Sequence, residues 1–230
     1  MPDALLDVAN LQRSVAGHAI LTGLSFQVRI GEVLFIRGAS GVGKSLLLRA
    51  LAYLDPIEGG VLTLEGRTPE QLGVPKWRAR VTYVPQTRVL NKGTPSELYF
   101  AAQQFKAQKG RPRSDLPAII HDLGLEPGVL NQQWSELSGG QAQRVVLALA
   151  LALQPKILLL DEVTSALDHD AVLKVEKVLK ACGAALIWVT HNDTQPARVG
   201  GRVLVLPLGT EMVVEQLPSS NQQPTHDIDK

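Results

Sequence analysis

Eight residues from Gly38 to Ser45 constrain this chain more than any other feature. They read Gly-Ala-Ser-Gly-Val-Gly-Lys-Ser and match the pattern G-x-x-x-x-G-K-[ST]. The apolar run Val33 to Ile36 precedes them and predicts a buried strand, whereas Leu46 to Leu54 predicts a helix that ends at Asp55-Pro56. A strand, a glycine-rich turn and a helix in this order form a cradle for a phosphate group, because backbone N–H groups and the positive helix end point at the anion.

Two side chains at the end of this loop carry the chemistry. Lys44 is expected to reach the β- and γ-phosphates of a nucleotide, and the Ser45 hydroxyl is expected to ligate Mg²⁺. The other loop residues are expected to wrap the β-phosphate: Gly38, Ala39, Ser40, Gly41, Val42 and Gly43. The loop therefore predicts that the chain binds ATP together with Mg²⁺.

A second candidate cluster follows an apolar strand. Ile157 to Leu160 is a short apolar run that ends in Asp161 and Glu162. A carboxylate at the tip of such a strand would lie beside the phosphate loop, so we expect Asp161 to hold Mg²⁺ through water. Glu162 is then placed to polarise the attacking water, and the pair predicts hydrolysis.

A third cluster, Leu137 to Gln141, opens a long helical pattern. Ser138 has the character of an N-cap, and Gly139 and Gly140 leave bare N–H donors suited to a γ-phosphate. Because the chain already has a complete cradle, this second anion site is expected to serve the nucleotide of a partner chain.

Strands alternate with helices along most of the chain, which predicts an α/β fold with a mainly parallel sheet. Further strands are expected at Val61 to Leu64, Val81 to Val84, Ala185 to Val189, Val203 to Leu206 and Met212 to Glu215. Helices are expected from Thr94 to about Leu123 with an interruption at Lys106 to Ser114, from Gly139 to Leu153, and from Asp170 to Lys180. Alternating apolar residues from Ala19 to Val28 predict an antiparallel β lobe. We expect one domain over 1–217, a helical subdomain inserted at roughly 86–154, and a disordered polar tail over 218–230.

Bulk properties limit the class of protein. A net charge of +1 argues against nucleic-acid binding. The single cysteine, Cys182, allows no intrachain disulfide and favours a reducing compartment. The N-terminus has no secretory pattern, and no apolar run reaches the ~20 residues that span a bilayer. We expect a cytoplasmic protein that reaches a membrane only through a partner.

With these clusters in this order, the sequence resembles the ATP-binding cassette (ABC) family. The resemblance covers about Leu5 to Glu215 and includes Ser165-Ala166-Leu167-Asp168 after the acidic pair. Gln86 follows a predicted strand as the family's lid glutamine does, and His191 follows another as its switch histidine does.

The resemblance implies a head-to-tail homodimer, or a dimer with a related ATPase subunit, closing over two ATP molecules. Ser138, Gly139, Gly140 and Gln141 of one chain would complete the site of the other. His191 would contact the γ-phosphate, and Asp168 would lie at the dimer seam. Gln86 would act in catalysis and at the metal, and would link hydrolysis to an integral membrane transporter subunit docked on the helical subdomain.

Three positions depart from the family pattern. The usual adenine-stacking aromatic is absent, and Arg13, Val15 and the less favoured His18 are the candidates in its place. If the Arg13 guanidinium stacks, its loss should weaken ATP binding more than loss of Val15. Leu149 stands where arginine is common, and Val163 stands where proline is usual. The segments around Val163 and His191 look like the small bacterial iron-export ATP-binding subunits, and more distantly like the plant aluminium-tolerance type.

The resulting hypothesis is the energising subunit of a membrane transporter, peripheral on the cytoplasmic face. The alternative is an ABC-type ATPase that drives soluble assembly such as iron–sulfur cluster biogenesis. A GTPase fits less well, because Asn91-Lys92-Gly93-Thr94 lacks the aspartate that reads guanine. A small-molecule kinase would leave Leu137 to Gln141 unexplained.

Overall fold

A six-stranded sheet forms the centre of the fold in the computed structural model, which describes residues 4–86, 92–207 and 209–214. Its order is β5-β6-β7-β3-β8-β9. The strands are β3 (Val33–Arg37), β5 (Val81–Val84), β6 (Ile157–Asp161), β7 (Ala185–Val189), β8 (Gly201–Val205) and β9 (Thr210–Val214). The five neighbouring strands β5, β6, β7, β3 and β8 are parallel to one another, and β9 pairs with β8 in the antiparallel direction. The predicted mainly parallel core is confirmed.

A smaller antiparallel sheet, the β lobe, has the order β2-β1-β4. It contains β1 (Leu6–Val15), β2 (His18–Val28) and β4 (Gly59–Leu64). The lobe was expected, but β1 was not predicted as a strand. Its pairing with β2 shifts register between Val8 and Leu11 and twice more further along, and Asn10 has a positive φ of 53°. Such irregularities break the alternation of apolar residues that identifies a strand in a sequence.

The helix after the phosphate loop, α1 (Lys44–Leu51), ends before the predicted Leu54. Tyr53 adopts a φ of 56°, which stops helical hydrogen bonding ahead of Asp55-Pro56. Three short helices, α2 (Pro69–Leu72), α3 (Val74–Arg80) and α8 (Gln195–Val199), were not predicted. Other predicted element boundaries agree within two residues, apart from Glu215, which lies outside the described residues.

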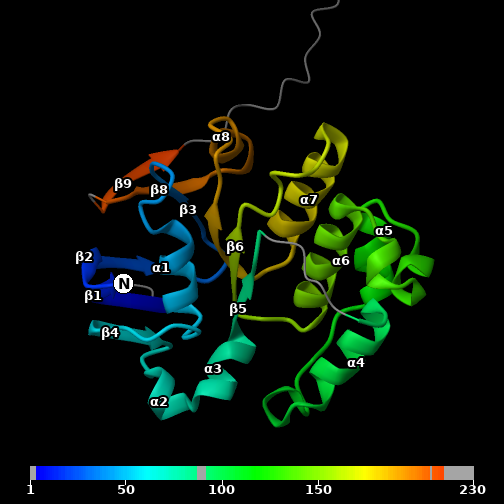
Figure 1. Ribbon diagram of the computed structural model, residues 1–230, viewed down its shortest axis with the longest axis horizontal. Coiled ribbons are helices and arrows are strands. Elements are labelled where there is room, and N and C mark those ends of the chain that lie inside the picture. Colours follow the sequence, from blue (N-terminus) through cyan, green and yellow to red (C-terminus); the bar gives the residue numbers. More distant parts are fainter. Residues whose placement is uncertain (1–3, 87–91, 208, 215–230) are drawn as a thin grey trace, which may run out of the picture.

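Helices fill the middle of the chain. They are α4 (Pro95–Gln104), α5 (Leu116–Asp122) and α6 (Gly139–Ala152), with single 3₁₀ turns at η1 (Lys106–Gln108), η2 (Pro127–Asn131) and η3 (Trp134–Glu136). Figure 1 shows this group together on the side of the sheet away from the β lobe. The domain limits stay predictions, and the tail at 218–230 lies outside the described residues. Within those residues, no helix has the length and apolar character to cross a membrane.

The two faces of the central sheet bury different partners. Leu158 and Leu160 of β6 join a core cluster with α5, α6 and α7 (His169–Ala181). Ile157 and Leu159, which point the other way, join a second cluster with α1 and the β lobe. All five residues of β6 are buried, as expected for a parallel strand covered on both faces. This sandwich holds the ends of β3 and β6 at one edge, where the candidate site lies.

Candidate nucleotide site

The phosphate loop between β3 and α1 is held in a form that needs glycine. Gly38, Gly41 and Gly43 have φ values of 151°, 78° and 101°. A Cβ on Gly38 would lie 2.8 Å from the Leu206 carbonyl oxygen, and one on Gly43 would lie 2.5 Å from Ile20 Cγ2. The loop therefore fits tightly between β2 and the end of β8, with its backbone N–H groups leading into α1.

Lys44 lies folded over this loop. Its Nζ donates to the carbonyl oxygens of Gly38 and Ala39, both at 3.0 Å, and the residue is only 6 % exposed. Ser45 follows in the first turn of α1 and is exposed. A buried ammonium held by two neutral carbonyls is ready to exchange them for phosphate oxygens, since charge-assisted hydrogen bonds are the stronger ones.

Asp161 ends β6 with only 2 % of its surface exposed. The Tyr83 hydroxyl donates to its Oδ2 at 2.8 Å. Burial and the neighbouring carboxylate raise the pKa of Tyr83, so its phenol stays protonated and remains the donor. Asp161 Oδ1 is buried and has no hydrogen-bond partner among the described residues. An orphaned carboxylate oxygen of this kind fits a water-coordinated cation.

Glu162 sits directly beyond Asp161 with a φ of 50°, a backbone form that non-glycine residues rarely adopt. Its N–H donates to the Val189 carbonyl at the end of β7. Gln86 Nε2 donates to Glu162 Oε2 at 2.8 Å, and His191 Nε2 lies 2.7 Å from Glu162 Oε1. The structure thus brings together all three residues expected to be catalytic, although their sequence positions are far apart.

The predicted partner-facing cluster begins α6. Ser138 Oγ accepts the Gln141 N–H at 3.2 Å, and Gln141 Oε1 accepts the Ser138 N–H at 2.9 Å, which is a reciprocal capping box. A Cβ on Gly139 would meet no atom within 4 Å, so space opens in front of the helix end. A Cβ on Gly140 would lie 3.2 Å from Leu167 Cδ2, so the cluster adjoins the segment after the acidic pair.

Two residues in the site were not singled out from the sequence. Tyr83 fixes Asp161, and Gln143 Nε2 donates at 3.0 Å to the carbonyl of Pro85, immediately before Gln86. Gln143 is a polar residue on the buried side of an apolar helix, and that mismatch was the available signal. Tyr83 gave no such signal, because a tyrosine in a strand has ordinary packing roles.

The three residues considered for contact with adenine differ in the contacts that they make in the structure. Arg13 Nη1 donates to Glu58 Oε1 at 2.9 Å, so its guanidinium is engaged within the β lobe. Val15 is 47 % exposed at the end of the β1–β2 hairpin, the same hairpin whose Ile20 packs against Gly43. His18 Nδ1 contacts the Ala16 carbonyl at 3.2 Å. Which of these residues contacts adenine stays a prediction: Val15 is the exposed apolar candidate, and Arg13 is held by its ion pair with Glu58.

A phosphate loop, an adjacent acidic strand end and a three-residue cluster around Glu162, on a parallel sheet with an antiparallel lobe, define an ATP-binding ATPase of the P-loop class. A family model described as ABC transporter matches residues 21–165, more than half of the chain. The chain belongs to the ABC transporter family, as an ATP-binding subunit.

Individual relatives agree with this assignment, and one solved structure shows the same fold. The chain is 32 % identical over 231 residues to the "Fe(3+) ions import ATP-binding protein FbpC" of Streptomyces coelicolor, covering 95 % of this chain and 66 % of that protein. It is 33 % identical over 216 residues to the "Probable iron export ATP-binding protein FetA" of Escherichia coli, covering 90 % and 94 %. The structure titled "Structure of ATP binding subunit of ABC transporter" superposes with a TM-score of 0.78 at 24 % identity, covering 91 % of this chain and 90 % of that one. The chain thus spans slightly less than two thirds of the FbpC protein and nearly all of the FetA length.

Proposed function

We propose that this subunit hydrolyses Mg-ATP at sites shared by two chains, and passes the resulting movement to an integral membrane partner. The observation that carries the proposal is the Glu162 carboxylate, which contacts both Gln86 and His191 at the strand end beside the phosphate loop. Two polar side chains converging on one carboxylate are typical of a reaction centre rather than of a solvated surface.

Phosphate binding begins with Lys44. Its ammonium leaves the carbonyl oxygens of Gly38 and Ala39 and binds the β- and γ-phosphates, while the loop from Gly38 to Gly43 donates its N–H groups. The positive end of α1 supports the same anion. These contacts carry most of the binding energy, and Val15 packs on the adenine.

The proposed Mg²⁺ site uses three groups that fit such an ion. They are the Ser45 hydroxyl, the unpaired Asp161 Oδ1 and the side-chain oxygen of Gln86. Bound Mg²⁺ would neutralise charge on the phosphates. Tyr83 holds the other Asp161 oxygen, which fixes the direction of the free one.

Glu162 is the proposed general base. Its carboxylate takes a proton from the attacking water, and Gln86 orients that carboxylate. His191 is half exposed and reaches Glu162 from the next strand, so it is free to turn to the γ-phosphate of bound ATP.

The second half of each site is proposed to come from a partner chain. Ser138, Gly139, Gly140 and Gln141 surround a helix end with open space in front of it. Its uncapped N–H groups suit the γ-phosphate of the opposite chain. The partner is a second copy, or a related ATPase subunit, arranged head to tail.

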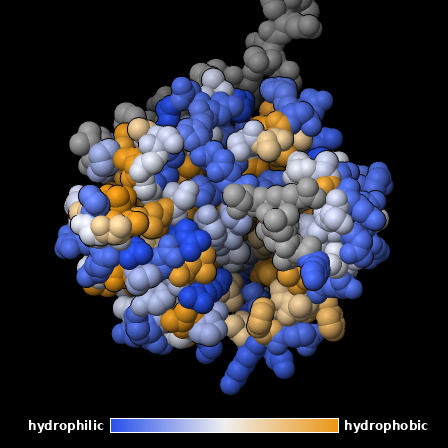
Figure 2. All heavy atoms as spheres, in the orientation of Figure 1, coloured by the Kyte–Doolittle hydropathy of each residue, from blue (hydrophilic) through white to orange (hydrophobic). Residues whose placement is uncertain are grey.

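The membrane subunit is proposed to dock near α4. Phe100, in the middle of α4, and Phe105, directly after it, are 65 % and 68 % exposed, and Leu98 is also exposed. Figure 2 shows apolar surface at the lower right, over the place of α4 in Figure 1. Gln143 links α6 to Pro85, which provides a route from this helical region to Gln86. The subunit would lie on the cytoplasmic face of the membrane, and iron is the cargo to test first because FbpC and FetA are both named for it.

Glu162→Gln tests the proposal. The variant should bind ATP normally and lose turnover by ~10²–10⁴-fold, the usual contribution of an acid–base group. With Mg-ATP it should elute from size-exclusion chromatography as a dimer, and with ADP as a monomer. A monomeric Glu162→Gln chain with full activity would refute both the catalytic role and the shared site. Affinity purification from a detergent extract should recover a membrane protein rather than soluble assembly factors.

A further inference from the structure

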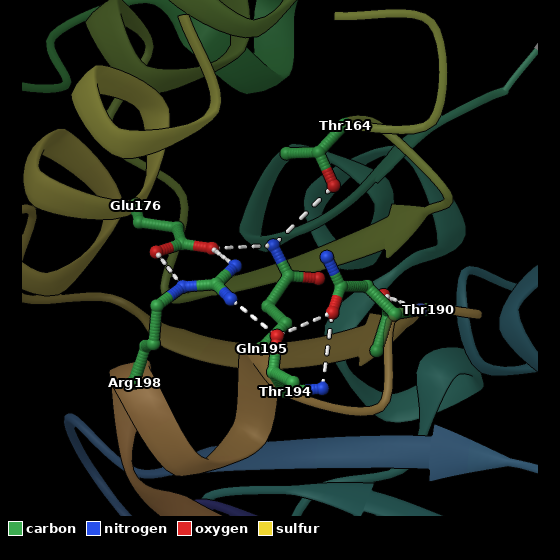
Figure 3. Close-up of polar contacts among 7 residues, drawn as sticks. Thr164, Glu176, Thr190, Thr194, Gln195 and Arg198 are labelled. Atoms are coloured by element: carbon green, nitrogen blue, oxygen red, sulfur yellow. Dashed lines mark hydrogen bonds and ion pairs between the residues drawn. The ribbon is translucent and has the colours of Figure 1, made fainter. Parts of the chain in front are cut away.

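A closed ring of polar contacts lies behind the candidate site, between α7 and α8 (Gln195–Val199). Figure 3 shows its members converging from both helices and from the two loops before them. At its centre is Gln195, which is 0 % exposed. Its Nε2 donates to Thr164 Oγ1 at 3.3 Å and to Glu176 Oε1 at 2.9 Å.

An ion pair between the buried Glu176 and the partly exposed Arg198 closes one side of the ring. Arg198 Nε and Nη2 donate to the two carboxylate oxygens of Glu176 at 3.2 and 2.7 Å. Arg198 Nη1 donates to Thr194 Oγ1 at 2.5 Å, and the Thr194 hydroxyl donates to Asn192 Oδ1 at 2.8 Å. The ring therefore runs without a gap from Thr164 to Asn192.

Two residues of this network adjoin the proposed reaction centre. Thr164 is two residues beyond Glu162, and Asn192 directly follows His191. The Gln195 backbone N–H also donates to the Asn192 carbonyl, at 3.2 Å. One residue thus contacts the His191 loop through its backbone and the Glu162 loop through its side chain.

The orientation of the Gln195 amide is set by charge. Its N–H₂ faces the Glu176 carboxylate, so a flipped amide would place two oxygens against each other. In the observed orientation Oε1 is buried without a hydrogen-bond partner within the described chain. An unpaired buried acceptor is unfavourable, and an apolar side chain of equal size would avoid that cost. Fold stability alone therefore does not favour glutamine at position 195. A requirement for the N–H donor of its side chain does.

We propose that Gln195 is a positioning residue, which holds the loops of Glu162 and His191 at the spacing needed for hydrolysis. This inference rests on the proposed function, because it assigns Gln195 a role only through those two residues. Glu162 has a rare left-handed backbone, and such conformations persist only where surrounding contacts enforce them. The hydrogen bond from Gln195 to Thr164 is one of those contacts, and α7 and α8 act as its rigid support.

Thr164 offers the cleanest substitution, because its hydroxyl is the acceptor on the Glu162 side. Thr164→Val has nearly the same shape without that acceptor, and Thr164→Ser keeps it. We expect Thr164→Val and Gln195→Met each to lower kcat by roughly tenfold, which matches the usual worth of one hydrogen bond, with KM for ATP changed less than about twofold. Thr164→Ser should retain most of the kcat.

Trp77→Phe is the matched control for a lost buried hydrogen bond. Trp77 Nε1 donates to the Leu51 carbonyl at 2.9 Å, away from both loops. This variant should lower the thermal midpoint and leave kcat unchanged. If Thr164→Val also lowers only the midpoint, Gln195 is a structural residue and the inference is overturned.

Glu162→Gln measured in parallel separates the two proposals. Lost turnover in Glu162→Gln together with normal kcat in Thr164→Val and Gln195→Met would overturn the positioning role alone. Full turnover in Glu162→Gln would overturn the proposed function itself. A reduced kcat with unchanged KM in Thr164→Val, rescued in Thr164→Ser, supports the role of Gln195.

Discussion

Replacing Gly43 by alanine adds one methyl group at the tightest point of the phosphate loop. The backbone there has a φ of 101°, and the new Cβ would lie 2.5 Å from Ile20 Cγ2. Two costs follow. An L residue in left-handed backbone is destabilised by roughly 1–2 kcal/mol. Because non-bonded carbons prefer about 3.5–4.0 Å, the loop or Ile20 must also shift by about 1 Å.

The backbone cost and the overpacking cost can each be estimated. Overpacking of this kind costs about 1–3 kcal/mol, so Gly43→Ala should lose roughly 2–5 kcal/mol of unfolding free energy. For a chain of this size each kcal/mol lowers the thermal midpoint by about 2–4 °C, which gives a fall of roughly 4–20 °C. ATP binding should weaken as well, because the displaced loop no longer points its N–H groups at one phosphate.

Gly41 provides the matched control within the same loop. It has a φ of 78°, yet a Cβ there would meet no atom within 4 Å. Gly41→Ala should therefore show only the backbone cost, a fall of about 2–8 °C. Adding Ile20→Ala should recover part of the loss in Gly43→Ala and none of the loss in Gly41→Ala, once the effect of Ile20→Ala alone is subtracted.

Differential scanning fluorimetry without nucleotide measures these midpoints, and ATP titration measures the affinities. Equal midpoints for Gly41→Ala and Gly43→Ala would refute the close packing of the loop against β2. The same conclusion would follow if Ile20→Ala rescued neither variant selectively.

Four further substitutions address the nucleotide directly. Lys44→Ala should remove most ATP binding, because the β- and γ-phosphates lose their counter-charge. An ATP affinity equal to that of the wild type, measured by titration, would refute the role of Lys44 in phosphate binding. Ser138→Arg should abolish hydrolysis by blocking the partner's phosphate, and mixing it with Lys44→Ala should leave at most one competent site per mixed dimer; normal turnover by Ser138→Arg alone would contradict the shared site. Val15→Ala should weaken ATP binding more than Arg13→Ala, and GTP should compete within roughly tenfold, or ~1.4 kcal/mol; a hundredfold preference for ATP that survives both changes would show that adenine is read elsewhere.

Local patterns in the sequence were enough to predict much of the architecture. The loop from Gly38 to Ser45 is identified by residues that are neighbours in the chain, and its conformation depends on those same residues. The buried strands β3, β6 and β7 were predicted because parallel strands covered on both faces read as continuous apolar runs. Ser138 and Gln141 form their capping box within one helical turn, so the spacing of these two residues is enough to predict the start of α6.

Contacts between distant segments were decided only by the tertiary structure. Tyr83 and Asp161 are 78 positions apart, and Gln86 and Glu162 are 76 apart, so their meeting depends on how β5 pairs with β6. Arg13 and Glu58 are 45 positions apart, and their ion pair depends on how the segments of the β lobe are placed. Gln195 looks like an ordinary polar residue of a short helix until α8 packs against α7. Sequence periodicity reports which way a side chain faces within its own element, but the relative placement of elements depends on packing across the whole core, and that placement decides which polar groups meet.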